Sequence, residues 1–183
     1  MKHNWKPGTM IYPLPAVLVS CGSSPEEYNI LTVAWTGTLC TNPPLCYVSV
    51  RPERHSYDIL RRNMEFVINL TTEELAFATD WCGVRSGKDY NKFEEMRLTP
   101  GKAEVVAAPI IEESPVCIEC RVKEIVPLGQ CAGGRPLPES RNRKIRIGFG
   151  TAVGICSWGV FRFGAEGGNV RLDGEKERKE KRI

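Results

Sequence analysis

Short stretches rich in β-branched and other apolar residues recur along the first two thirds of the chain. Each is bounded by glycine, proline, asparagine or serine, a pattern typical of strands joined by turns. Proline cannot occupy a central ladder position, so the Asn-Pro-Pro at 42–44 separates two of these strands. The pattern favours an antiparallel barrel or sandwich, with strands expected over residues 14–23, 29–39, 45–51, 65–70 and 114–126.

Two helices are expected between the strands. Residues 56–63 start with Ser56 as the expected N-cap, carry an acidic residue in the first turn and two arginines near the end, and so suit the helix dipole. Residues 72–83 start with Thr72 as a cap and stop at Gly83. The architecture expected is mainly β with short helices.

Composition bounds the class of protein. With 183 residues, the chain suits one domain of ordinary size. No apolar run approaches the ~20 residues of a membrane span, and the first ten residues lack the apolar stretch of a signal peptide. We therefore expect a cytoplasmic protein that does not bind membranes, and its eight cysteines are interpreted as reduced, mostly buried thiols.

The spacing of Cys117 and Cys120 resembles a redox or zinc pair. However, both lie in an expected strand, where residues three apart point to opposite faces. The alternative of a metal or dithiol role is therefore disfavoured, and no metal site is expected.

Charge is divided unevenly along the chain. Residues 1–128 hold 13 lysines and arginines against 16 acidic residues, whereas residues 129–183 hold 12 against 6. The basic balance is thus a property of the C-terminal part alone, and no aromatic residues alternate with basic ones as in a nucleic-acid module. We expect no nucleic-acid partner.

Three stretches could carry chemistry. In residues 49–60, a strand leads through a proline turn into a helix whose start, with Arg51, Arg54 and Ser56, could bind phosphate. Residues 82–93 form a basic Ser-Gly loop that could cradle an anion. For both, the alternatives are an ordinary capped helix and a solvent loop.

The third stretch, residues 32–44, is apolar on both faces and then opens into Thr, Gly and Thr, so its amides could press against a flat ligand. Trp35 itself is expected in the core. The two histidines, His3 and His55, have no recognisable catalytic partner nearby, and neither a P-loop nor a GxGxxG follows a strand. Hydrolase and dinucleotide-fold interpretations lose weight accordingly.

Together, "NILTVAWTGTLCTNPPLCYVSVRPERHSYDILRRNMEFVINL" and "DWCGVRSGKDYNKFE" closely resemble the flavoredoxin branch of the flavin reductase-like family, which are FMN-binding split β-barrels. The resemblance runs from about Pro13 to Gly129. It implies a Greek-key split barrel over residues 1–129, a homodimer, and non-covalent FMN near the subunit interface.

The resemblance also implies a cofactor-binding set. The TVAWTGT segment would line the isoalloxazine and ribityl chain, the segment after the third strand would lie near the phosphate, and the Ser-Gly loop would close over it. Cys40 stands where the family more often has a polar residue. The set comprises Asn29, Thr32, Val33, Ala34, Trp35, Thr36, Cys40, Arg51, His55, Ser56, Tyr57, Ser86, Gly87, Lys88 and Lys92.

In such proteins flavin N5 accepts hydride from a nicotinamide, so the resemblance implies an NAD(P)H-dependent flavin or ferric reductase without a protein-derived catalytic residue. The alternative is a non-enzymatic FMN electron carrier that docks a redox protein. A weaker alternative is a pyridoxamine-phosphate-oxidase-like protein on the same barrel.

Residues 130–183 depart from this pattern. Shifting the reading frame by one base allows residues 155–175 to be reread as "YAHGEYFALGQKVGTFGWTVK", which resembles the closing pattern of the family. The sequence therefore predicts a frame break near Gly129, an aberrant tail, a barrel that lacks its last strands, and impaired FMN binding and dimerisation. The alternative is a genuine lineage-specific tail.

Overall fold

The structure is a computed structural model that describes residues 3–4, 9–127 and 152–163. For residues 152–163 only the backbone is described. Most of the expected aberrant tail, residues 130–151 and 164–183, therefore lies outside the described residues.

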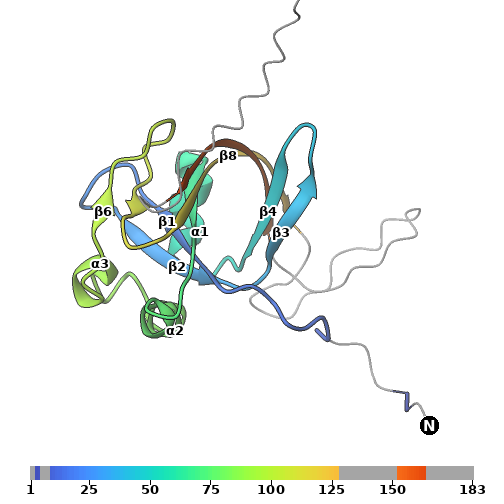
Figure 1. Cartoon of the computed structure of the whole chain (residues 1–183), viewed down its shortest axis with the longest axis horizontal. Helices are drawn as coiled ribbons and strands as arrows, with labels where there is room; N and C mark the ends of the chain where they lie inside the picture. The colour runs from blue at the N-terminus through green and yellow to red at the C-terminus, as the bar shows by residue number, and fades with distance from the viewer. Residues whose placement is uncertain (1–2, 5–8, 128–151, 164–183) are drawn as a thin grey trace, which may run out of the picture.

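One antiparallel sheet of seven strands dominates the described part of the chain (Figure 1). Its strand order is β2-β1-β5-β8-β9-β4-β3, and a separate pair, β6 (Pro100–Gly101) and β7 (Ile110–Ile111), lies beside it. The strands of the large sheet are β1 (Val17–Cys21), β2 (Asn29–Val33), β3 (Thr36–Cys40), β4 (Leu45–Val50), β5 (Glu65–Leu70), β8 (Val116–Pro127) and β9 (Ala152–Phe163).

The connection between β2 and β3 closes this sheet into a barrel. The two strands lie at opposite ends of the strand order, yet only Ala34 and Trp35 join them. The sheet must therefore curl until its ends meet, and the backbone N–H of Ser49 in β4 donates to the Trp35 carbonyl at 2.9 Å across this junction. The prediction of a mainly β, antiparallel barrel is confirmed, but the single strand expected over residues 29–39 is two strands.

In the part of the chain that the structure describes, three helices pack against the barrel, and their starts differ from those expected. Helix α1 (His55–Asn63) begins after Arg54, and Ser56 lies inside it rather than at the N-cap, because Ser56 is buried against β2. Helix α2 (Ala76–Val84) begins after Leu75, beyond Thr72. Helix α3 (Lys92–Glu95) was not expected, since one helical turn gives no periodic signal.

The core has two main parts, one inside the barrel and one beneath α2 and α3. Val19 and Phe66 belong to the barrel interior, whereas Leu18 and Ile30 pack under the helices. Leu18 and Val19 are neighbours in β1, so their side chains point to opposite faces. Both faces of β1 are buried, which explains why its sequence is continuously apolar instead of alternating.

Cys117 and Cys120 lie in different hydrophobic clusters, as the strand alternation predicts. Cys120 belongs to the barrel interior, where its sulfur lies 3.9 Å from the sulfur of Cys46. Cys117 packs outside the barrel with Val67, Ala108 and neighbouring residues. The two cysteines therefore face different environments.

Residues 152–163 take a place in the barrel that the sequence did not predict. Their backbone forms β9, which pairs antiparallel with both β4 and β8. The expected absence of the last strands thus does not describe this segment. The physical reason lies in its composition: β-branched and aromatic residues recur along "AVGICSWGVFRF", and both neighbouring strands would otherwise expose their edges.

Among the described residues, no helix combines the length and apolar character that crossing a membrane requires.

Candidate functional site

A cavity of about 200 Å³ opens where β2, the junction that follows it, β4 and the turn before α1 meet. We call it the β2–β4 pocket. Because the first and third candidate stretches converge here, residues that are distant in sequence share one wall. The lining residues are Leu31, Thr32, Val33, Ala34, Trp35, Ser49, Val50, Arg51 and Arg54.

The junction between β2 and β3 forms one wall of the β2–β4 pocket. Trp35 is 39% exposed, so the expectation that it belongs to the core is wrong. Its carbonyl is held by Ser49, and the hydroxyl of Thr36 donates to the Tyr47 carbonyl at 2.7 Å. These bonds fix the junction and leave the indole at the mouth of the pocket, where a flat ligand could lie against it.

A buried polar pair lies at the start of β2. The side-chain amide of Asn29 donates to the hydroxyl of Ser56 at 2.7 Å, which ties the start of β2 to the first turn of α1. Both side chains are buried, with Ser56 at 2% exposure. Gly87 approaches the pair closely, since a Cβ built on it would lie 2.2 Å from Oδ1 of Asn29. The structure therefore brings together the first predicted stretch, through Ser56, and the second, through Gly87, at Asn29 of β2.

Lys92 supplies a buried cation next to this pair. Its side chain donates to the carbonyls of Ile30 and Cys82, both at 2.8 Å, and the residue is only 2% exposed. Burial lowers the pKa of Lys92, and Cys21, which is hydrogen-bonded to Ser56, is among the groups it interacts with electrostatically. A buried cation without a counter-ion is costly.

Neither of the two ion pairs within the described part of the chain involves Lys92. They join Arg62 to Glu27 and Arg121 to Glu65, and neither lies in the β2–β4 pocket. The acceptors of Lys92 are neutral carbonyls at the end of α2 and in β2. A bound anion near the Asn29–Ser56 pair would supply the missing negative charge.

Arg54 is a pocket residue that the predicted set omitted. Its guanidinium donates to the carbonyl of Gly83 at 3.1 Å and so connects the turn before α1 to the last turn of α2. It lines the β2–β4 pocket together with Arg51. The stretch 49–60 had already marked Arg54 as a candidate for binding phosphate, although the set implied by the resemblance left it out.

Several predicted residues lie outside the pocket lining. Tyr57 packs against the barrel core and lines a separate interior cavity. Cys40 ends β3, where its sulfur lies 3.3 Å from the Asn42 carbonyl. His55 is half-buried at the start of α1, and Lys88 is exposed in the Ser-Gly loop, where its backbone N–H donates to the Ser86 hydroxyl at 3.2 Å.

The sequence profile of the flavin reductase like domain matches residues 9–132. The chain belongs to this family. Flavin reductase-like proteins of known structure share the barrel, and flavoredoxin of Desulfovibrio vulgaris (Miyazaki F) superposes with a TM-score of 0.72 at 24% identity, over 91% of this chain and 78% of that one. An FMN-binding protein of Thermus thermophilus superposes with a TM-score of 0.66 at 17% identity, over 91% of this chain and 81% of that one.

Sequence relatives of this flavin reductase-like chain match about two thirds of its length. An uncharacterized protein of Archaeoglobus fulgidus is 32% identical over 119 residues, which are 65% of this chain and 66% of that protein. The chain therefore spans slightly less than two thirds of this relative. No group of three or more metal-ligating side chains occurs among the residues that the structure describes.

Thiol chemistry can test the geometry around Lys92. Burial raises the pKa of Cys21 to about 12 and that of Cys82 to about 11. Both thiols stay protonated below these values, and only the thiolate reacts with iodoacetamide. In native protein at about pH 8.5, Cys21 and Cys82 should therefore remain unmodified. The less buried Cys40 should react. Protection should fail only as the pH approaches the raised pKa values or when the protein unfolds.

Peptide mass mapping after native and denatured labelling measures this directly. Labelling of native Cys21 as fast as Cys40 would contradict the buried cluster.

Proposed function

We propose that this protein binds FMN in the β2–β4 pocket and acts as an NAD(P)H-dependent flavin or ferric reductase. The observation that carries the proposal is the buried cation of Lys92 beside the Asn29–Ser56 pair, because the phosphate of FMN would balance its charge. Membership in the flavin reductase-like family supports a flavin-related redox function. When bound, FMN supplies a ring that accepts hydride at N5 and passes electrons onward.

The residues of the site would divide the work between the two ends of the cofactor. The Ser56 hydroxyl and the backbone of the Gly87 loop would hold the phosphate, with Arg51 and Arg54 adding positive charge at the pocket. The main chain at Ala34 and the indole of Trp35 would position the ring. This division asks no acid–base catalysis of the protein, in keeping with a set that contains no catalytic residue.

A non-enzymatic FMN electron carrier is the second candidate, favoured by the structural likeness to flavoredoxin. Oxidation of NADH and of NADPH in the presence of excess FMN separates the two. Turnover well above that of free flavin, with either nicotinamide, supports the reductase. Stoichiometric flavin binding without turnover supports the carrier, and absence of flavin binding contradicts both.

We also propose that the protein forms a homodimer in the cytoplasm. Exposed apolar side chains support a partner surface, among them Ile11 and Tyr12 before β1 and Leu39 on β3. Light scattering on the purified protein should give about twice the chain mass of 20.5 kDa. A mass of one chain at micromolar concentration would contradict the dimer.

Residues 130–183, we further propose, arise from a shifted reading frame. The family match ends at residue 132, close to the expected break near Gly129, which supports this origin. If so, both FMN binding and dimerisation would be weaker in this chain than in a repaired one. Resequencing the gene around codons 125–135 decides the origin, since an intact frame would contradict it.

A further inference from the structure

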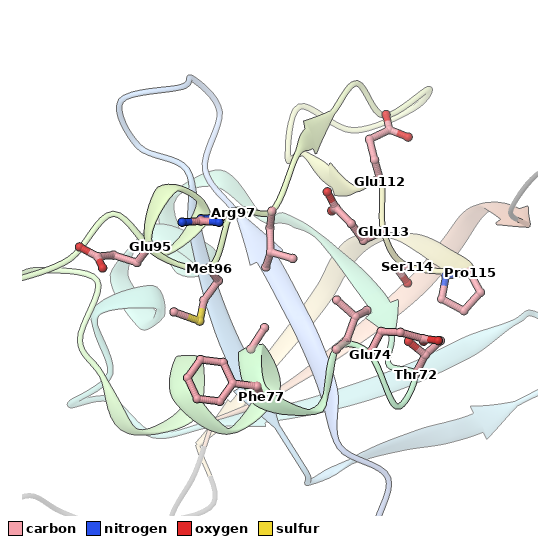
Figure 2. Close-up of a pocket in the computed structure, with 13 residues that line it drawn as sticks. Thr72, Glu74, Phe77, Glu95, Met96, Arg97, Glu112, Glu113, Ser114 and Pro115 are labelled. Carbon is pink, nitrogen blue, oxygen red and sulfur yellow. The ribbon is translucent and has the colours of Figure 1, made fainter.

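A second cavity lies on the side of the molecule formed by α2, α3 and the turn between β7 and β8 (Figure 2). Its volume is about 670 Å³, and none of its residues lines the β2–β4 pocket. We call it the α2–α3 groove. It is lined by Thr72, Glu74, Leu75, Phe77, Ala78, Glu95, Met96, Arg97, Leu98, Glu112, Glu113, Ser114 and Pro115.

The inner surface of the α2–α3 groove is apolar. Leu75, Ala78 and Leu98 are buried and belong to the cluster beneath the helices, against which Met96 packs. Phe77 also lines the groove but is 72% exposed, so its ring is available to an incoming apolar side chain. Burying such a ring removes a large apolar surface from water, which favours binding of an apolar side chain there.

Acidic side chains surround this apolar surface. Glu74 precedes α2, Glu95 ends α3, and Glu112 and Glu113 follow β7, while Arg97 is the single cation of the lining. Neither of the ion pairs found among the described residues involves any of them. The groove is therefore negative, although the whole chain carries a formal charge of +3.

The carboxylates are not equivalent. The carboxylate of Glu113 already accepts a hydrogen bond from the backbone N–H of Thr99 at 3.0 Å, so it stabilises the fold. A hydrogen bond from Thr72 lowers the pKa of Glu74, which therefore stays ionised at neutral pH. Glu95 and Glu112 are exposed and lie on different segments at the rim of the groove, where Figure 2 shows their carboxylates directed outward. They add negative charge around the opening.

Helix α2 connects the groove to the β2–β4 pocket. Leu75, Phe77 and Ala78 at its start line the groove, and the carbonyl of Gly83 in its last turn is bound by Arg54 of the pocket. The nine residues of α2 span about 13 Å at 1.5 Å per residue. An occupant of the groove would thus lie about one short helix away from the pocket.

We propose that the α2–α3 groove docks a basic segment of an electron-transfer partner protein, with an apolar side chain seated against Phe77 and Met96. Carboxylates on separate segments match several cations spaced along a polypeptide better than a single small cation. The electron-transfer role of the partner rests on the proposed flavin function. The docking itself does not, because no groove residue belongs to the pocket.

The test uses the full chain without added flavin and a fluorescein-labelled synthetic peptide with lysine and leucine at helical spacing. Two matched peptides replace every lysine by glutamate or every leucine by serine. Fluorescence anisotropy should show that only the peptide with both lysine and leucine binds. Its affinity should fall as the salt concentration rises. Because the measurement needs no flavin, its failure is distinguishable from failure of flavin binding.

Three variants locate the binding. Combining Glu74→Gln with Glu112→Gln should weaken the peptide at least about fivefold, and Phe77→Ser about tenfold. The control Glu26→Gln removes an exposed carboxylate from the turn between β1 and β2 and should change nothing. All four substituted positions are exposed, so the folded barrel should persist, which circular dichroism checks.

Other results would overturn the proposal. Equal binding of the lysine and glutamate peptides, or equal affinity of all three variants, would show that the groove is not the docking site. If spermidine displaces the labelled peptide at concentrations close to the dissociation constant of the peptide, the groove takes a free cation. Conversion of a dimer to a monomer by Phe77→Ser would show that a second copy of this chain covers it.

Discussion

Replacing Lys92 with methionine should weaken FMN binding at least about tenfold and lower the free energy of unfolding by about 1–3 kcal/mol. Methionine preserves the length of the side chain but removes its charge and its donors. The carbonyls of Ile30 and Cys82 then lose a hydrogen-bond partner in a buried region. The first effect is read from flavin fluorescence titration and the second from urea unfolding without flavin.

Riboflavin separates the role of the charge from that of the fold, because it lacks the phosphate. If Lys92 acts on the phosphate, Lys92→Met should reduce FMN affinity much more than riboflavin affinity. Lys102→Met is the matched control, since Lys102 is exposed just after β6. Equal losses for both flavins would mean that Lys92 is purely structural, and unchanged FMN affinity would contradict its place in the site.

Gly87→Ala should weaken FMN about 10- to 100-fold. The new Cβ would lie 2.2 Å from Oδ1 and 2.6 Å from Cγ of Asn29, so that side chain must move and its bond to Ser56 breaks. Losing a hydrogen-bonded arrangement around an anion costs about 1–3 kcal/mol, which corresponds to that range.

A double-mutant cycle with Asn29→Ala tests this cause. Removing the obstructing side chain should make Gly87→Ala nearly neutral, so the two substitutions should not be additive. Additive losses in FMN affinity would show that Gly87 acts by another route.

The pattern of apolar residues was sufficient to predict most strands of the barrel. Strands β4, β5 and β8 lie within two residues of their expected bounds because turn residues flank each one. The break between β2 and β3 was missed since Ala34 and Trp35 continue the apolar run without glycine or proline. Only closure of the barrel requires the chain to turn there.

The candidate site was predicted in part, for a similar reason. The order of the motifs predicted that the three stretches lie close together, and the structure places residues of each near β2. The burial of single side chains depends on packing that local sequence does not encode. Ser56 has the character of a helix cap, yet tertiary contact with Asn29 places it inside the helix. Lys92 stands in a basic loop sequence, where solvent exposure would be the usual expectation, whereas α3 folds it inward onto β2.

Comparison of FMN with riboflavin on the unaltered chain tests the central claim most directly. Titration by flavin fluorescence anisotropy should show FMN bound at one equivalent per chain and at least about tenfold tighter than riboflavin, because the phosphate meets Ser56 and the charge of Lys92. Equal affinities for the two flavins, or no binding of either by a chain that circular dichroism shows to be folded, would contradict it.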